Sequence, residues 1–524
     1  MMKIRLLIIL WISFWCTLLA EEKPKQNLQK LTVESTKYFD INKIKTAIQN
    51  NGVFARNPET GNSGLYFNNV PLIYVSGFWM AAKVDSEIRA SAADYFTDLA
   101  GSAFDDSGNP FGKEDSTFRV YKISRGDNAM NNPDYAEWPI EIGAPQTKSG
   151  MPLIIGDQTL WCSFTDAYPE NRSYNPCPPL NAEVHLTVCG LDTLENVVFF
   201  HWQFWNHGLK PWHDAYLGCF IDPDIGYTNN NLVGSDSTLS FAYTFEHTNW
   251  QQYDTTFAVC FAMLASPIIA SFGDTAITFN GPKPDYKNAN VLSPLAYKHW
   301  PFEWVMPSHG ESYAKIWIYR RLSGRDNDGQ AMIDSTTGNP TYWGLSGDPI
   351  NQTGWIDEEP QDRFMMISTG PFDLEPNESN SMTIAVIAVT DSNYFGTIPK
   401  LKERSAEVHT FFRKEMKKLT GIQADYSSSN KISSFQLYQN YPNPFNHSTQ
   451  IKFHMKKSAK ARLIIYNVQG QFIKVLLDDF KNAGSHQVVW DGTDQHGQQV
   501  SSGLFFYQLK SGDKIVTQKM IHIK

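Results

Sequence analysis

Short apolar and aromatic runs, each closed by turn residues, dominate the chain between about residues 180 and 280. The clearest runs are residues 183–188, 197–205, 215–221, 239–245, 257–264 and 276–279. They are rich in β-branched and aromatic residues and are bounded by Gly, Asn, Asp or Pro, which is typical of strands. No segment of helical length separates them, so the pattern predicts an antiparallel β-sandwich rather than an α/β fold.

The strand pattern continues on both sides of this region, and only one segment has clear helical periodicity. Further strands are predicted at residues 72–84, 313–319, 363–368 and 382–390. Between residues 398 and 419, apolar side chains such as Leu401, Val408 and Phe412 recur at steps of three and four. We expect this helix to dock on the sandwich. The fold class predicted is mainly β, with a large sandwich-rich N-terminal region and one docking helix.

The first twenty residues have the layout of a secretory signal peptide. Lys3 and Arg5 precede an apolar run over residues 6–19, and Ala20 is followed by charged residues. A membrane anchor is the alternative, but the run is short for a bilayer span. We therefore expect export, with no membrane span once residues 1–20 are removed.

Changes in composition divide the remaining chain. Residues 21–40 are polar and predict a flexible lead-in, and residues 41–419 form the β-rich region, as one domain or two. Residues 420–433 are poor in apolar side chains and rich in Ser, which predicts a linker. Residues 434–524 again show strand periodicity and predict a compact β domain.

Composition excludes several classes of protein. The chain is 42% hydrophobic and 19% charged, which is enough apolar mass for a large core and argues against disorder. Its 45 Lys and Arg against 54 Asp and Glu leave a formal charge of −9. Without a basic block, we expect no binding of nucleic acid.

An odd number of cysteines follows the signal segment: Cys162, Cys177, Cys189, Cys219 and Cys260. Their spacing contains no metal-binding C-x-x-C pattern. One disulfide, such as Cys162–Cys177, and buried free thiols in strands are both open readings.

A dense motif series marks the C-terminal domain. It begins with Tyr441, Pro442, Asn443, Pro444, Phe445 and Asn446, and continues with Trp490, Asp491, Gly492 and Gly503. With these residues, the domain resembles the type A sorting domain of the type IX secretion system, also described as a FlgD-like immunoglobulin module. His447 stands where that family usually has Pro.

The resemblance implies an immunoglobulin-like β-sandwich that a type IX secretion translocon recognises through residues 434–524. It also implies passage through the periplasm to the outer cell surface or the medium. An ordinary adhesive immunoglobulin-like module is the alternative. The preceding region resembles uncharacterised cargo of such proteins, which implies no activity.

The best candidate for a bound cofactor is an Asp- and Asn-rich loop. Asp222, Asp224, Asn230 and Asp236 lie in a Gly-containing segment between two predicted strands. Calcium prefers six to eight oxygen ligands, and such a loop can supply several of them. A turn in which the carboxylates bind backbone N–H groups is the alternative. We expect a structural calcium ion there.

Other constellations are weaker. Asp326-Asn327-Asp328-Gly329 predicts a plain turn, and His201, His207 and His213 are too interrupted for a convincing metal site. Glu303, Asp348 and Asp357–Glu359, with the tryptophans at 300, 304, 343 and 355, suggest glycan binding or hydrolysis as an alternative. No catalytic motif is present, so a non-enzymatic structural or adhesive role of a secreted protein is favoured.

Overall fold

The computed structural model describes most of the chain from residue 35 onward. The described residues are 35–523 except 106, 114, 173–176, 227, 248–254, 294–296, 299–311, 327, 421–434, 439, 441, 456–457, 469 and 513. The predicted signal peptide, most of the predicted lead-in and nearly all of the predicted linker therefore lie outside the described residues.

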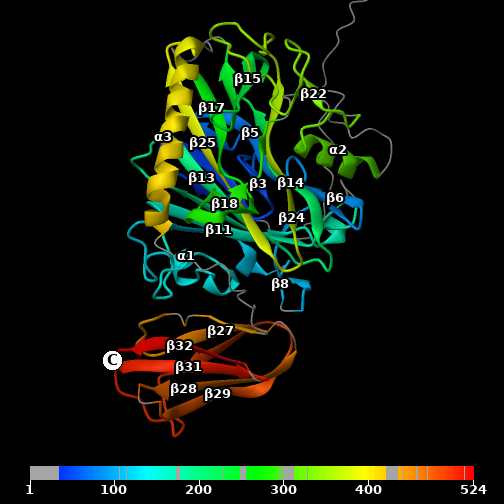
Figure 1. The fold of residues 1–524 in the computed structure, drawn as a ribbon. Helices are drawn as coiled ribbons and strands as arrows, with labels where there is room; N and C mark the ends of the chain where they lie inside the picture. Colours follow the sequence, from blue (N-terminus) through cyan, green and yellow to red (C-terminus); the bar gives the residue numbers. More distant parts are fainter. Residues whose placement is uncertain are drawn as a thin grey trace, which may run out of the picture.

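Two large antiparallel sheets form the N-terminal region (Figure 1). The first has the order β1-β2-β3-β5-β14-β24-β20, with β4, β6 and β21 beside this path. Its strands are β1 (Thr36–Phe39), β2 (Ile44–Gln49), β3 (Val53–Phe54), β4 (Leu65–Phe67), β5 (Val70–Val84), β6 (Glu87–Ala92), β14 (Trp212–Pro223), β20 (Val291–Leu292), β21 (Tyr297–Lys298) and β24 (Arg363–Leu374).

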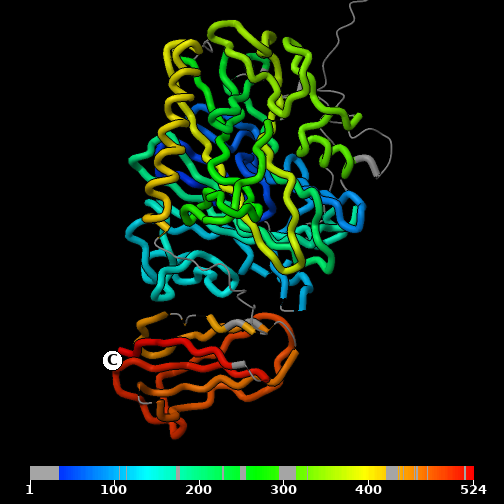
Figure 2. The backbone as a smooth tube through the Cα atoms, in the orientation of Figure 1, coloured from blue at the N-terminus to red at the C-terminus, as the bar shows by residue number. Residues whose placement is uncertain are grey.

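The second sheet has the order β10-β11-β12-β13-β25-β17-β16-β15, with β7 paired to β11. Its strands are β7 (Ala100–Gly101), β10 (Tyr121–Ser124), β11 (Gln158–Thr165), β12 (Ala182–Gly190), β13 (Val197–Asn206), β15 (Asn231–Asp236), β16 (Phe241–Glu246), β17 (Thr256–Ala265) and β25 (Ser379–Asp391). Strands far apart in sequence lie side by side in both sheets (Figure 2).

The other short helices and strands of the N-terminal region lie outside the two large sheets. They are β8 (Ala103–Phe104), β9 (Pro110–Phe111), β18 (Ile268–Thr278), β19 (Gly281–Asn288), β22 (Met332–Ile333), β23 (Pro340–Thr341), α1 (Pro133–Ala136), η1 (Ser116–Phe118), η2 (Ile140–Ile142), η3 (Pro169–Asn171) and η4 (Thr228–Asn230).

Aromatic side chains join the facing sides of the two sheets. Phe54 of the first sheet lies 4.7 Å from Phe200 of the second, measured between ring centroids. Phe78 stacks on Trp202 at 5.8 Å. These residues belong to one buried cluster with members from both sheets. The prediction of a mainly β fold built on an antiparallel sandwich is confirmed.

Several central strands are buried on both faces. All ten residues of β17 and all nine of β12 are buried. A strand that is covered on both faces needs a continuous apolar run rather than strict alternation. The second covering layer explains why runs such as residues 257–264 showed so few polar positions.

Helix α3 (Tyr394–Thr420) covers the outer face of the second sheet (Figure 1). It extends a few residues beyond the predicted span of 398–419. Leu401, Val408 and Phe412 are buried in a cluster with β17 and β25. The apolar stripe is thus the docking face, as the periodicity predicted.

Helix α2 (Ser312–Leu322) corrects the strand predicted at residues 313–319. Ala314, Trp317, Ile318 and Leu322 are buried, and their spacing of three and four is helical. Trp317 lies 5.7 Å from Trp79, between ring centroids, on the outer face of the first sheet. The local β-propensity of this segment was overridden by packing against the sheet.

The predicted flexible lead-in is also corrected at its end. Residues 36–39 form β1, which pairs antiparallel with β2. Phe39 is fully buried, so one aromatic anchor holds this edge strand on the core.

The five cysteines after residue 20 are buried and none forms a disulfide, which agrees with the reading of free thiols.

The C-terminal domain is a smaller sandwich with its own buried cluster. One sheet has the order β26-β27-β30 and the other β29-β28-β31-β32. The strands are β26 (Phe435–Leu437), β27 (Thr449–Met455), β28 (Ala459–Asn467), β29 (Phe472–Lys481), β30 (Gly484–Trp490), β31 (Gly503–Ser511) and β32 (Lys514–His522).

Among the helices within the described ranges, none is both long enough and apolar enough to span a bilayer.

The docking of α3 generates a stability prediction. Phe412 is 3% exposed and packs near Phe279. We expect Phe412→Ala to lower the free energy of unfolding by about 3–4 kcal/mol, because it leaves a cavity under the helix. Urea unfolding of the full chain measures the change. Lys414→Ala, at an exposed position on the same helix, is the control. A loss for Phe412→Ala no larger than that of the control would contradict the proposed docking.

Candidate functional site

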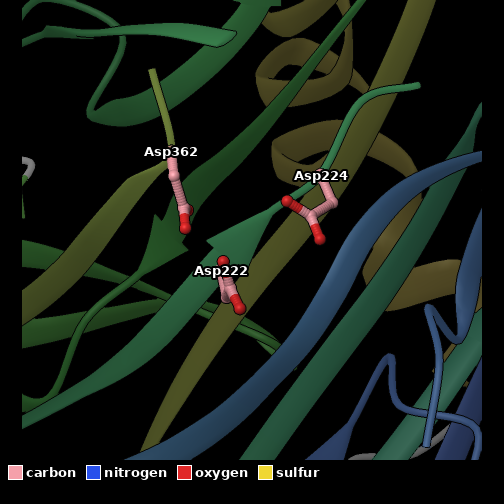
Figure 3. Close-up of side chains that lie close together, drawn as sticks. All are labelled: Asp222, Asp224 and Asp362. Carbon is pink, nitrogen blue, oxygen red and sulfur yellow. The ribbon is translucent and has the colours of Figure 1, made fainter. Parts of the chain in front are cut away.

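Three aspartates converge where β14 ends and β24 begins. Asp222 is near the end of β14, Asp224 follows it, and Asp362 precedes β24. A carboxylate oxygen from each lies within 4.8 Å of those of the other two (Figure 3). We call these residues the aspartate triad.

Antiparallel pairing brings the triad together. The register joins Ile221 of β14 to Met365 of β24. Continued past the strand ends, the same register sets Asp224 opposite Asp362. On its other side β14 pairs with β5, with Asp222 opposite Val75. The site is therefore built on the ends of central strands rather than on one loop.

Backbone contacts hold the loop after β14 against β5. The N–H of Asp224 donates to the carbonyl of Leu72 at 3.0 Å. The N–H of Ile225 donates to the side-chain oxygen of Asn231 at 3.1 Å. Gly226 has a positive φ of 63°, which lets the chain turn back at this point. These contacts place the Asp224 carboxylate before any ligand binds.

Burial makes the concentration of negative charge costly. Asp222 is 4% exposed, and the Tyr95 hydroxyl donates a hydrogen bond to its carboxylate. Burial, and then the charge of Asp362, raise the pKa of Asp224 to about 7. Its Oδ1 atom is buried and accepts no hydrogen bond. A cation placed between the carboxylates would relieve both the repulsion and the unsatisfied oxygen.

The donor set suits a hard cation. Carboxylate oxygens are the ligands that Ca²⁺ and Mg²⁺ prefer, and Ca²⁺ accepts irregular geometry. The aspartate triad can thus hold a metal ion, with remaining ligands to come from backbone carbonyls or water.

The structure does not bring all four predicted calcium ligands together. Asp222 and Asp224 join the triad. Asp236 ends β15, where it pairs with Lys402 of α3 at 3.1 Å and accepts the N–H of Thr238 at 3.0 Å. Asp236 and Asn231 stand at opposite ends of β15, about 16 Å apart along the strand. Asn230 ends η4, and its carbonyl accepts the N–H of His247 at 3.0 Å.

Asp362 was missed by sequence reasoning. It lies 138 residues after Asp224 in the chain, just ahead of a predicted strand. An acidic residue at a strand end was the available signal. Without knowing that β14 pairs with β24, nothing distinguished it from the many other acids at strand ends.

The side chains of the weaker sequence candidates already form hydrogen bonds or ion pairs with other residues. Asp326 accepts the N–H groups of Asp328 and Gln330, as in an ordinary turn. The histidines are separate: His201 bonds Thr383 at 2.9 Å, while His207 and His213 pair with Glu183 and Asp373.

Two of the acids considered for glycan hydrolysis are engaged in the same way, while Glu358 and Glu359 are exposed. Asp357 forms an ion pair with Arg363, and both side chains are nearly buried. Asp348 accepts the N–H of Ile350 at 2.8 Å in a turn. Glu303, Trp300 and Trp304 lie outside the described residues.

The residues of the C-terminal motif are mostly structural. Phe445 and Trp490 are buried and lie 5.4 Å apart, between ring centroids. The N–H of Phe445 donates to the carbonyl of Ile521 at 3.0 Å, and the Asn443 side chain accepts the N–H of Ile521 at 2.8 Å. This opening segment thereby binds the last strand.

The remaining motif residues shape turns. Asp491 accepts the N–H and hydroxyl of Thr493, and Gly492 has a positive φ of 69°. Gly503 begins β31, while Pro442 accepts the Thr449 hydroxyl at 2.8 Å. Pro444 follows a cis peptide bond and Asn446 accepts from His522. Tyr441 lies outside the described residues.

Comparison with known proteins identifies the C-terminal domain. Residues 443–513 match the family model of the FlgD Ig-like domain. The chain therefore carries a C-terminal FlgD Ig-like domain. No curated protein matches the sequence.

Solved structures resemble the chain only remotely. A polysaccharide lyase is 8% identical, with a TM-score of 0.17, over 65% of this chain and 34% of that one. Dimeric latent PorU from Porphyromonas gingivalis is 9% identical, with a TM-score of 0.16, over 94% and 32%. PorZ, a surface component of the type-IX secretion system of the same organism, is 10% identical, with a TM-score of 0.14, over 86% and 58%. The chain spans about a third of the length of the first two. Likeness at this level carries no argument about function.

The raised pKa of Asp224 generates a prediction for the metal-free protein. Unfolding lowers this pKa from about 7 toward its ordinary 3.8. The folded state therefore holds the proton more tightly, and the free energy of unfolding falls as pH rises from 4 to 7. We expect Asp224→Asn to remove this loss, so that in chelator the variant exceeds the native chain by on the order of 2 kcal/mol at pH 7.5 but not at pH 4.

Denaturant unfolding at both pH values measures this difference. Asp328→Asn makes the same charge change at an exposed turn and is the control. If the advantage of Asp224→Asn over the native chain is the same at pH 4 and pH 7.5, Asp224 is not the titrating group described here.

Proposed function

We propose that this chain is an exported surface or extracellular protein whose residues 434–524 direct it through a type IX-like secretion pathway. In this proposal the N-terminal sandwich is the cargo, with a structural or adhesive role and no catalysis. The observation that supports it best is a FlgD Ig-like domain with an exposed apolar sheet face at the C-terminal end of the described chain.

The outer face of the four-stranded sheet in this domain carries the apolar side chains. Tyr466 is paired with Phe472 on one side and Phe506 on the other, and Leu504 is paired with Ile521. Ile464 and Val475 form the next pair. We call these seven residues the outer patch.

The outer patch is exposed enough to bind a partner. Phe472 is 50% exposed, Ile521 43% and Leu504 37%. Half of the exposed large apolar side chains of the described residues belong to this small domain. Contiguous apolar surface of this kind is typical of interaction sites.

The burial of the motif residues sharpens this proposal. Since Phe445 and Trp490 lie in the core, a partner cannot touch them in the folded domain. Their role is to maintain the fold and secure the last strand. Recognition of the folded domain must then use exposed groups, and the outer patch supplies apolar groups of this kind on the four-stranded sheet.

We further propose that the aspartate triad holds a structural calcium ion. Such an ion would tie the end of β14 to the start of β24 and neutralise three acidic groups at once. Its stabilising effect follows from binding to the folded chain alone.

The export proposal predicts that the outer patch, and not general hydrophobicity, determines secretion. In a bacterium with a type IX pathway, we expect Phe472→Ser combined with Leu504→Ser to strongly reduce the extracellular amount of the full chain. Phe480→Ser is the matched control. Phe480 is 62% exposed on the same strand, at roughly 25 Å from Phe472 and paired with Lys460.

Immunoblots of medium, surface and periplasm measure the distribution, and thermal unfolding confirms that the variants fold. Accumulation in the periplasm is the expected result for the double variant. Normal secretion of a chain truncated after residue 433 would overturn the export proposal itself. Normal secretion of the double variant alone would overturn the role of the patch.

The calcium proposal predicts a stability change that depends on Asp362. For the full chain, we expect calcium at a hundred times its dissociation constant to raise Tm by about 3 °C relative to chelator. Asp362→Asn should abolish the increase, because it removes one of three ligands. Asp236→Asn should retain it, since Asp236 pairs with Lys402 outside the triad. Equal Tm values with calcium and with chelator in the native chain would contradict the proposal.

A further inference from the structure

A cleft of about 480 Å³ opens at the outer side of the first sheet, beside β20 and β24. This volume is within the range of small-molecule sites, about 300–1,000 Å³. Its lining includes Tyr216, Ser240, Asn290, Arg325, Tyr342 and Trp343. None of them belongs to the aspartate triad.

Three aromatic rings line the cleft. Tyr216 comes from β14 and packs edge-on against Tyr319 of α2, with 5.6 Å between ring centroids. Tyr342 is 50% exposed, although it is a large aromatic side chain, and Trp343 beside it is partly exposed. Flat rings of this kind pack against the C–H faces of sugar rings, while the Tyr hydroxyl and Trp N–H remain available for hydrogen bonds.

A cation lies among these rings. Arg325 is exposed, and its Nη1 donates to the carbonyl of Gly329 at 2.9 Å. In the part of the chain that the structure describes, it forms no ion pair with an acidic side chain. A guanidinium carries five N–H donors in a planar fork that fits a carboxylate or a sulfate. The remaining donors of Arg325 thus suit an anionic group in the cleft.

The wall that carries Tyr342 and Trp343 is held in place by backbone contacts. The N–H of Ser293 donates to the carbonyl of Tyr342 at 3.1 Å, and the N–H of Gly344 donates back to Ser293 at 2.9 Å. On the other side, the Ser235 hydroxyl donates to the carbonyl of Gly344 at 2.7 Å. The segment is thereby tied to both β20 and β15. A preformed wall lowers the ordering cost of binding.

Polar groups complete the lining. Ser237 and Ser240 supply hydroxyls, and Asn290 supplies an amide that can both donate and accept. Apolar stacking surface, neutral hydrogen-bonding groups and a single cation form the combination that an acidic sugar requires. A purely apolar ligand would make no hydrogen bond to the remaining donors of Arg325 or to the hydroxyls of Ser237 and Ser240.

We infer that this cleft binds a saccharide with an anionic substituent, either a uronic acid or a sulfated sugar, with its ring on Tyr342 and Trp343 and its acidic group at Arg325. The inference depends neither on the export route nor on the cation at the triad.

Isothermal titration calorimetry of the full chain tests whether the cleft binds an anionic saccharide. The probes are a galacturonic acid trisaccharide, a κ-carrageenan oligosaccharide, which carries sulfate but no carboxylate, and the neutral maltotriose, each in calcium and in chelator. We expect saturable binding of at least one acidic probe, at least tenfold tighter than maltotriose, in both buffers. The preferred acidic probe distinguishes carboxylate from sulfate.

Variants assign the binding to the cleft. Tyr342→Ala should weaken the acidic probe at least tenfold, whereas Tyr342→Phe should retain most of the affinity because the ring remains. Arg325→Gln should reduce the acidic probe to the level of maltotriose. Phe272→Ala is the control, since Phe272 is 98% exposed on β18 and does not line the cleft.

Unchanged Tm values establish that these surface variants fold. The inference is overturned if neither acidic probe binds the native chain, or if Tyr342→Ala and Arg325→Gln both bind as the native chain does. Equal binding of acidic and neutral probes, unaffected by Arg325→Gln, would overturn the anionic specificity.

Discussion

The structure depends on the burial of two sheets against each other. The rings of Phe54, Phe78, Phe200 and Trp202 meet across this interface, and their contacts join segments more than 120 residues apart in sequence. Hydrophobic burial of this extent is non-directional, but the strand register makes it specific. Because both sheets are also covered on their outer faces by α2 and α3, the central strands hold their ends in defined positions.

Strand β14 contributes residues to both candidate binding sites. It lies between β5 and β24 in the first sheet. Near its beginning, Tyr216 lines the cleft together with Tyr342 and Arg325. At its end, Asp222 and Asp224 meet Asp362. The two candidate binding sites thus share one central strand, and each is completed by a segment from beyond residue 290.

In the C-terminal domain, the residues of the sequence motif differ from the residues of the exposed apolar sheet face. The motif that marks the domain combines two buried aromatic residues, Phe445 and Trp490, with turn formers such as Gly492, which the small sandwich needs in order to close. The exposed apolar sheet face consists instead of Phe472, Leu504 and their neighbours. A motif that is easily recognised in sequence reports the fold of the domain, whereas its exposed apolar surface lies at less distinctive positions.

The sequence by itself determined the mainly β fold, the helix near residues 398–419 and the C-terminal immunoglobulin-like module. The first two follow from local periodicity and turn chemistry, which act over a few residues, and the third from the resemblance of its motif to a known family. Tertiary structure alone decided that residues 313–319 are helical, because the buried spacing of Trp317, Ile318 and Leu322 matters only once a sheet is present to cover. It also decided that Asp224 lies beside Asp362 while Asp236 pairs with Lys402. Long-range strand pairing leaves no local trace in the sequence, so the partners of an acidic residue are known only when the register is known.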